Sequence, residues 1–210
     1  MDELSAKVVL LGSGAVGKTS LVRRFVESKF DDDYITTIGV NVKKKMLNEF
    51  GLKLIIWDIY GQKLSTRLHT SNYAGANGAI VVCDLTRRST FEDVDHWIQD
   101  LFNTVGHVPV VVLGNKVDII EDYESGRLDM DFHSYMLDQH SDVVEYYRKV
   151  YKEIPRFDRI PQDVMNRWLQ MKNDSVGQDL PFYRTSAKTG ENVETAFKKL
   201  GEMILDSDVL

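Results

Sequence analysis

The sequence has little of what secreted, membrane-spanning or metal-binding structural proteins need. It contains one cysteine, Cys83, so an internal disulfide is impossible and a reducing intracellular setting fits best. The five histidines are dispersed and show no spacing typical of metal ligands. No stretch approaches the roughly 20 apolar residues of a membrane helix, and the first residues lack the cationic segment and apolar run of a signal peptide.

Lipidation motifs are also missing. The residue after Met1 is Asp2 rather than glycine, and residues 206–210 contain no cysteine, so we expect no encoded membrane anchor. We therefore expect a cytoplasmic protein, with peripheral membrane association only if the natural C-terminus is longer.

The charge balance argues against a further class of function. The chain carries 26 Lys and Arg against 32 Asp and Glu, a formal net charge of −6, and the acidic residues are spread along it. This balance argues against a general nucleic-acid or anionic-membrane binder. With 210 residues, of which 43% are hydrophobic, the chain can bury a full core and is expected to form one domain.

Apolar segments with strand and helix patterns alternate along much of the chain. Strands are expected at 6–11, 39–47, 52–57, 79–84, 108–115 and 181–186, and helices at 21–29, 91–105 and 193–204. Residues 48–51 are short enough to join their two strands as an antiparallel hairpin. The near-continuous Val, Ile and Leu of the other strands predict a mostly parallel sheet with helices on both faces. Ligands of such folds bind at the carboxyl ends of the strands.

Three successive lysines, Lys43, Lys44 and Lys45, lie on the first strand of the hairpin. They are either a basic patch for a partner or charges that discourage edge-to-edge pairing of an exposed strand. We favour the second interpretation.

The interval between residues 119 and 180 does not fit the alternation. Connections in compact α/β units usually have about 2 to 6 residues, or a dozen or more when they include a helix. Apolar residues at 143–154, and again at 164–169 after Pro161, follow helical spacing. We therefore expect a single domain, residues 1–210, with a helical insertion at 119–180 packed on its core.

The stretch LGSGAVGKTS, residues 11–20, matches two fingerprints. One is the G-x-G-x-x-G of a dinucleotide-binding turn, and the acidic residues at 31–33 lie at about the distance where its ribose-binding acid is expected. These acids follow a helix, however, whereas that acid should end a strand. The other fingerprint is a P-loop, and it alone explains Lys18 as a phosphate-binding charge and Thr19 as a hydroxyl for Mg²⁺. We favour the P-loop.

The motif Asn-Lys-Val-Asp at residues 115–118 indicates which nucleotide base the P-loop protein binds. It follows directly on the strand at 108–115. An ionised carboxylate only accepts hydrogen bonds, and guanine presents two adjacent donors on its pairing edge, whereas adenine has no ring N–H there. A carboxylate from Asp118 held in the base pocket would therefore favour guanine.

Five motifs together resemble the Ras superfamily of small GTPases, and their wording is closest to the Rab family. They are GSGAVGKT (12–19), YITTIGV (34–40), WDIYGQ (57–62), NKVD (115–118) and TSAK (185–188), in the order that the family has. The resemblance covers residues 6–118 and 181–206. It implies the P-loop NTPase fold called the G domain: three layers, with a six-stranded mostly parallel sheet, helices on both faces and one antiparallel edge strand.

The resemblance also implies a site for GTP or GDP. The residues expected to bind the nucleotide are Gly14, Ala15, Val16, Gly17, Lys18, Thr19, Ser20, Phe30, Tyr34, Thr37, Gly61, Asn115, Lys116, Asp118, Ser186, Ala187 and Lys188. Phe30 would lie against the guanine and Tyr34 over the phosphates. Asn115 and Asp118 would meet the base edge, and the Ala187 N–H would meet the guanine carbonyl.

Metal binding and hydrolysis are expected from a smaller set. The hydroxyls of Thr19 and Thr37 would ligate Mg²⁺, and Asp58 would hold a metal-bound water. Gly61 would donate its N–H to the γ-phosphate, and Gln62 would orient the attacking water. The expected catalytic residues are Gln62, Lys18 and Gly61.

A nucleotide-dependent switch that hydrolyses GTP to GDP and phosphate is the function that this resemblance implies. No arginine is obviously placed to reach the γ-phosphate, so we expect slow hydrolysis unless a GTPase-activating protein supplies one, which can accelerate such enzymes by roughly 10³ to 10⁵. Effectors and exchange factors are the other expected partners, and the protein is expected to be a monomer that does not bind nucleic acid. Tyr60 stands where the family has a small residue, and this supports an alternative, a binding module that holds GTP or GDP with little hydrolysis.

Overall fold

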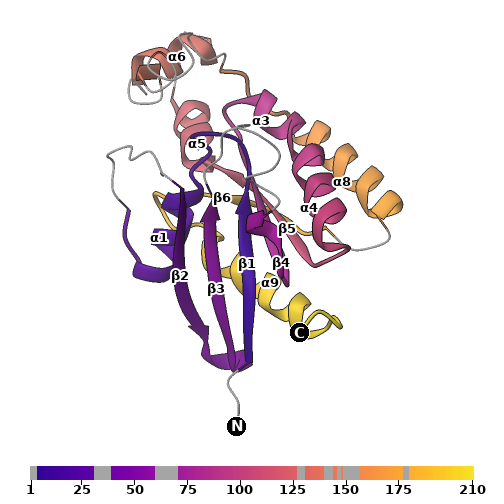
Figure 1. The fold of residues 1–210 in the computed structure, drawn as a ribbon. Helices are drawn as coiled ribbons and strands as arrows, with labels where there is room; N and C mark the ends of the chain where they lie inside the picture. The colour runs from indigo at the N-terminus through magenta and orange to yellow at the C-terminus, as the bar shows by residue number, and fades with distance from the viewer. Residues whose placement is uncertain are drawn as a thin grey trace.

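The fold is built on a six-stranded sheet (Figure 1). A computed structural model describes residues 4–30, 39–59, 71–126, 131–139, 144–145, 148, 157–176 and 180–210. The strands are β1 (Leu4–Leu11), β2 (Val40–Leu47), β3 (Leu52–Ile59), β4 (Gly78–Asp84), β5 (Val110–Asn115) and β6 (Phe182–Thr185). Their order across the sheet is β2-β3-β1-β4-β5-β6, and only the edge strand β2 is antiparallel to its neighbour. The predicted sheet is confirmed.

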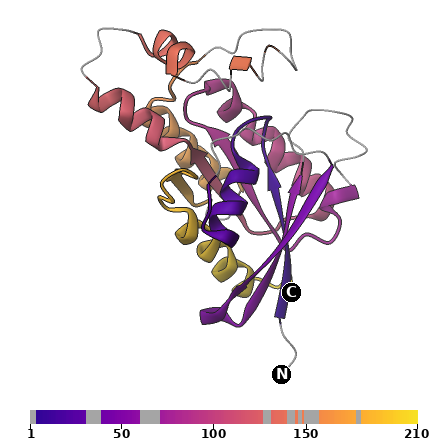
Figure 2. The ribbon, with the colours of Figure 1, turned by 90° about the vertical axis from the view of Figure 1, so that its left-hand side faces the viewer.

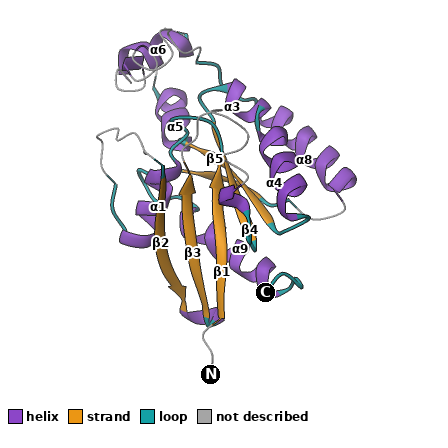
Figure 3. Ribbon diagram, viewed as in Figure 1, coloured by secondary structure: helices purple, strands orange, loops and turns teal. Residues whose placement is uncertain are grey.

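Helices cover both faces of the sheet, so the domain has three layers, with the strands between the helices (Figures 2 and 3). The helices are α1 (Lys18–Glu27), the 3₁₀ helix η1 (Asn48–Phe50), α3 (Arg88–Glu92), α4 (Val94–Val105), α5 (Val117–Ser125), α6 (Phe132–Gln139), α8 (Gln162–Val176) and α9 (Val193–Leu205). Along β4, Val81 and Cys83 face the cluster under α4, while Ile80 and Val82 face the cluster under α1 and α9. This alternation explains why an entirely apolar strand is buried on both sides.

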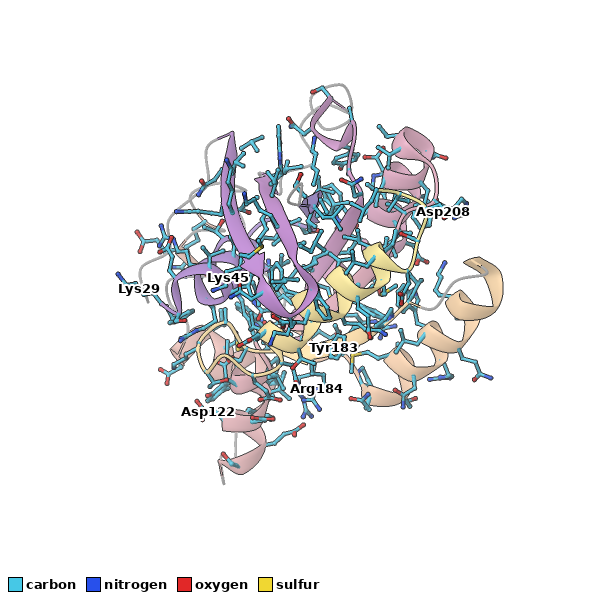
Figure 4. All side chains as sticks on the ribbon, turned by 90° about the horizontal axis from the view of Figure 1, so that it is seen from below. Lys29, Lys45, Asp122, Tyr183, Arg184 and Asp208 are labelled. Atoms are coloured by element: carbon cyan, nitrogen blue, oxygen red, sulfur yellow. The ribbon has the colours of Figure 1, made fainter. Side chains whose placement is uncertain are left out.

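The two edges of the sheet differ in their side chains. β2, which carries Lys45, forms one edge, and β6, which carries Tyr183 and Arg184, forms the other (Figure 4). Lys43 pairs with Glu27 on α1 at 2.9 Å. The lysine-rich strand is therefore an edge strand, as the charge pattern predicts.

The apolar pattern at 91–105 forms two helices rather than one. α3 ends at Glu92 and α4 begins at Val94, with Asp93 between them. The Asp93 carboxylate accepts a hydrogen bond from Ser13 Oγ at 2.8 Å, so the break in the helix lies against the glycine-rich loop.

The interval from 119 to 180 is mostly helical where it is described, and residues 157–160 are an exception. α8 contains the residues predicted at 164–169 and starts directly after Pro161, whose carbonyl accepts the first two helical N–H bonds. The predicted helix at 143–154 lies mostly outside the described residues. α6 was not predicted, although Phe132, Tyr135 and Met136 have the i, i+3, i+4 spacing of one buried helix face.

One aromatic contact holds α8 on α3, and a hydrogen bond and an ion pair hold it on α4. The rings of Trp168 and Phe91 lie 5.3 Å apart edge to face, and Trp168 Nε1 donates to Asp95 Oδ1 at 3.0 Å. Lys172 also pairs with Asp95, at 2.9 Å. In the part of the chain that the structure describes, no helix has the length and apolarity needed to cross a membrane.

Candidate functional site

The loop between β1 and α1 has a shape that requires glycine at two positions. Gly12 has φ +135° and Gly17 has φ +95°, both in the region that disfavours other residues. A Cβ on Gly12 would lie 2.2 Å from the Val82 carbonyl oxygen, and one on Gly17 would lie 2.3 Å from Asn115 Nδ2. Gly14, Ala15 and the buried Val16 form the rest of the turn. α1 begins immediately after it, so the N–H groups of its first turn, which include that of Ser20, lie next to the loop.

Lys18 places a buried cation inside this loop. Its side chain is 7% exposed, and Nζ donates to the carbonyl oxygens of Gly12 at 2.7 Å and Ser13 at 2.9 Å. Burial lowers the pKa of Lys18 to about 8, against the opposing effect of Asp58. A buried ammonium whose described hydrogen bonds go to two carbonyl oxygens is a strong site for phosphate oxygens.

Thr19 and Asp58 form a pair where β3 approaches α1. Thr19 Oγ1 donates to Asp58 Oδ2 at 2.6 Å. No described residue hydrogen-bonds Asp58 Oδ1, although that atom is buried. Burial raises the pKa of Asp58 by more than the Thr19 hydrogen bond and the charge of Lys18 lower it, so the charged form is only partly compensated. A hard cation near these oxygens would supply that compensation, so the pair fits the donor chemistry of Mg²⁺.

Asn115 at the end of β5 joins the phosphate-binding loop to the loop after β6. Its Nδ2 donates to the Val16 carbonyl at 2.9 Å, and its Oδ1 accepts from the Ala187 N–H at 3.2 Å and the Thr185 hydroxyl at 3.4 Å. The structure therefore places Asn115 and the Ala187 N–H, both expected at the base, in a bond with each other. Asp118 lies in the first turn of α5, two residues beyond Lys116.

The loop at 185–188 is fixed from two sides. Ser186 is buried, and its Oγ accepts from the Thr189 N–H at 3.0 Å. Arg24 on α1 donates from Nε to the Ala187 carbonyl at 2.7 Å and from Nη2 to the carbonyl of Lys188. Arg24 was missed by sequence reasoning because only the fold brings the end of α1 to this loop.

A buried ionic cluster at the end of β4 was also missed. Asp84 Oδ2 pairs with Arg87 Nε at 2.8 Å and with Lys116 Nζ at 2.9 Å. Its Oδ1 accepts from the N–H and the hydroxyl of Thr86, at 2.9 and 2.6 Å. Burial alone would raise the pKa of Asp84, but Lys116 and Arg87 outweigh burial and hold this pKa well below its usual range. The available signal was the position of Asp84 at the carboxyl end of a central strand.

For several residues singled out from the sequence, the structure either gives no placement or places them at the margin of the site. Tyr34, Thr37, Tyr60, Gly61 and Gln62 lie outside the described residues. Phe30 and Lys188 are described by the structure. Phe30 is half-buried against the cluster under α1 and α9, and the Lys188 side chain is exposed.

Together these features define the class of protein. The site lies at the carboxyl edge of a mostly parallel sheet. It contains a glycine-rich loop with a buried lysine, a threonine–aspartate pair and a strand that ends in Asn-Lys-x-Asp. This is the site of a P-loop nucleotide-binding protein.

Comparison with known proteins then gives the family. The Ras family model matches residues 7–206. The chain is 31% identical to the Ras-related protein Rab7 of Drosophila melanogaster over 207 residues, which are 95% of this chain and 80% of the relative. It is 31% identical to the GTP-binding protein YPT52 of Saccharomyces cerevisiae over 215 residues, covering 97% and 83%. The Ras-related protein Rab-21 of Bos taurus is 44% identical over 118 residues, 55% of this chain and 53% of the relative.

The chain therefore belongs to the Ras family. It is a Rab-like small GTPase, a GTP-binding protein of the switch type.

Proposed function

We propose that the loop at 12–19 holds the phosphates of GTP or GDP, that residues 115–118 and 185–188 hold the guanine, and that bound GTP is hydrolysed slowly. The observation that carries the proposal is the meeting of buried Lys18, the Thr19–Asp58 pair and Asn115 at one edge of the sheet. The bond from Asn115 to the Val16 carbonyl connects the proposed base-binding residues to the loop that carries Lys18 and Thr19, and Thr19 in turn bonds Asp58.

The roles of individual residues follow from the geometry and from the family. Lys18 Nζ would turn from the carbonyls of Gly12 and Ser13 to phosphate oxygens, exchanging two dipoles for full charges. Thr19 and Asp58 would hold Mg²⁺ together with Thr37. When bound, Mg²⁺ neutralises charge on the β- and γ-phosphates.

Hydrolysis would depend on the segment that follows β3. The N–H of Gly61 would donate to the γ-phosphate and Gln62 would orient the attacking water. Loss of the γ-phosphate would then release the contacts made by Thr37 and Gly61, which is the change that effectors would detect.

Tyr60 favours a second candidate function, a binding module that hardly hydrolyses GTP. Single-turnover phosphate release from GTP-loaded protein separates the two candidates. We expect release over minutes to hours and its loss in Gln62→Leu. Absence of release in both proteins would refute hydrolysis and support the module.

Base and phosphate recognition have separate tests. Lys18→Ala should weaken GDP and ADP alike, because it removes a phosphate-binding charge. Asp118→Asn should weaken GDP selectively, because an amide offers one acceptor in place of two. Unchanged GDP affinity in Asp118→Asn would show that the base pocket is wrongly placed.

The organisation of the whole chain is part of the proposal. We infer one G domain over residues 1–210 with residues 119–180 as a helical insertion, because Trp168 and Tyr135 belong to the same buried cluster as Trp97 of α4. We further propose a cytoplasmic monomer that is regulated by an exchange factor and a GTPase-activating protein. Light scattering of the GDP-bound protein tests the monomer, and a dimer mass would refute it.

A further inference from the structure

Arg87 is a buried arginine that touches the phosphate-binding loop. Its side chain is 1% exposed, although arginine is rarely buried so completely. Nη2 donates to the Gly14 carbonyl oxygen at 3.1 Å, and Nε donates to Asp84 Oδ2 at 2.8 Å. One planar guanidinium therefore connects the end of β4 to the middle of the loop after β1.

This contact fixes the orientation of one peptide unit. A trans peptide is planar, so its N–H points opposite to its C=O. Because the Gly14 carbonyl points at Arg87, the N–H of Ala15 points away from Arg87. A P-loop binds phosphate by turning such N–H groups toward the anion, and a peptide that is free to flip would present its carbonyl oxygen instead.

Two groups of contacts hold Arg87 in place, one at its side chain and one at the backbone of residues 85–88. The carboxylate that it pairs with is fixed by Thr86 and Lys116. In addition, the segment at 157–160 runs beside the segment at 85–88. The Asp158 N–H donates to the Thr86 carbonyl at 2.9 Å, the Arg88 N–H donates to the Asp158 carbonyl at 3.1 Å, and the Ile160 N–H donates to the Leu85 carbonyl at 3.3 Å.

We propose that Arg87 is a positioning residue for nucleotide binding: it holds the Gly14–Ala15 peptide with its N–H toward the phosphates, and the segment at 157–160 holds Arg87 in place. The inference rests on the proposed function, since it needs a nucleotide on the loop. It gives the interval at 119–180 a role, because backbone hydrogen bonds to 85–88 connect that interval to the phosphate site through one side chain.

The first test removes the guanidinium. Arg87→Gln loses both the ion pair and the bond to the loop, and we expect GDP release about ten- to a hundredfold faster, the effect of losing a hydrogen bond from a charged group. Release is followed with a fluorescent GDP analogue chased by excess GDP. Arg88→Gln is the matched control: Arg88 is the next residue and pairs with Glu92 at the surface, so its release rate should equal that of the wild type.

A second measurement separates positioning from stability alone. Melting temperatures are recorded with and without GDP, because the shift caused by a ligand reports its affinity. A smaller GDP-induced shift in Arg87→Gln supports positioning, and an equal loss in both conditions overturns it. Should Arg87→Gln fail to fold, Arg87→Lys keeps a charge beside Asp84 but lacks the fork that also reaches Gly14, so it should fold and still release GDP faster.

The third test removes the link to 157–160. Arg88 is the first residue of α3, where proline is accepted, and Arg87 has the extended backbone (φ −138°, ψ 97°) that suits a residue before proline. Arg88→Pro therefore removes the N–H that bonds Asp158 at little other cost. We expect about two- to tenfold faster GDP release than in Arg88→Gln.

The outcomes distinguish this inference from the function on which it rests. A wild-type protein that does not retain GDP would overturn both. Tight binding by the wild type with unchanged release from Arg87→Gln would overturn the role of Arg87 alone. Equal release from Arg88→Pro and Arg88→Gln would overturn the role of the segment at 157–160.

Discussion

Asn115→Ala is the change for which the structure gives the clearest magnitude. The amide makes two well-formed buried hydrogen bonds, to the Val16 carbonyl and from the Ala187 N–H, and a longer one from Thr185. Each neutral bond contributes about 1 kcal/mol, and a buried group left without its partner costs about 1–3 kcal/mol. Alanine leaves two such backbone groups, so we expect the free energy of unfolding to fall by about 2–6 kcal/mol.

The measurement is urea unfolding of nucleotide-free protein, because bound GDP would add its own stabilisation. In thermal unfolding of the same protein, the melting temperature should fall on the order of 10 °C for a chain of this length. Asn166→Ala is the matched control: this asparagine is exposed on α8 and accepts one bond from Gln162, so its loss should cost less than about 0.5 kcal/mol. A cost for Asn115→Ala no larger than that of the control would refute the bridging role.

Four further predictions concern the glycine loop and the core. Gly17→Ala should abolish detectable GDP binding, because its Cβ would overlap Asn115 Nδ2 at 2.3 Å and its φ is +95°; binding within tenfold of the wild type would contradict this. GDP affinity should fall as pH rises above 8, because burial lowers the pKa of Lys18 to about 8 and the neutral amine loses its attraction for phosphate. GDP affinity measured from pH 7 to 9 should show this decrease in the wild type and not in Lys18→Met. The same shift predicts greater stability of the nucleotide-free protein as pH rises from about 8 toward 10.5, since the unfolded chain then binds more protons. Cys83 should resist thiol reagents until the protein unfolds, because it is fully buried and burial raises its pKa; fast labelling of folded protein would show that β4 is open.

Local sequence patterns were sufficient for most of the architecture. The apolar runs of β4 and β5 favoured buried strands, and the four-residue connection at 48–51 favoured a hairpin. The interval at 119–180 was harder, because helices stabilised by packing on a distant surface show weak local signals. α8 was predicted from the helical spacing of its apolar residues. α6 also has apolar residues at helical spacing on one face, but it was not predicted.

For the site, the sequence by itself determined which chemical groups are present and in what order. Gly12, Gly17, Lys18 and the motif at 115–118 predict a phosphate loop and a guanine pocket, because these residue types have few other uses at such spacing. The tertiary structure alone decided how those groups are held together. Asn115 bonds residues that are 99 and 72 positions away, and Arg87 reaches Gly14 across 73 positions. Such partners are set by the order of strands in the sheet, and no local pattern in the chain encodes that order.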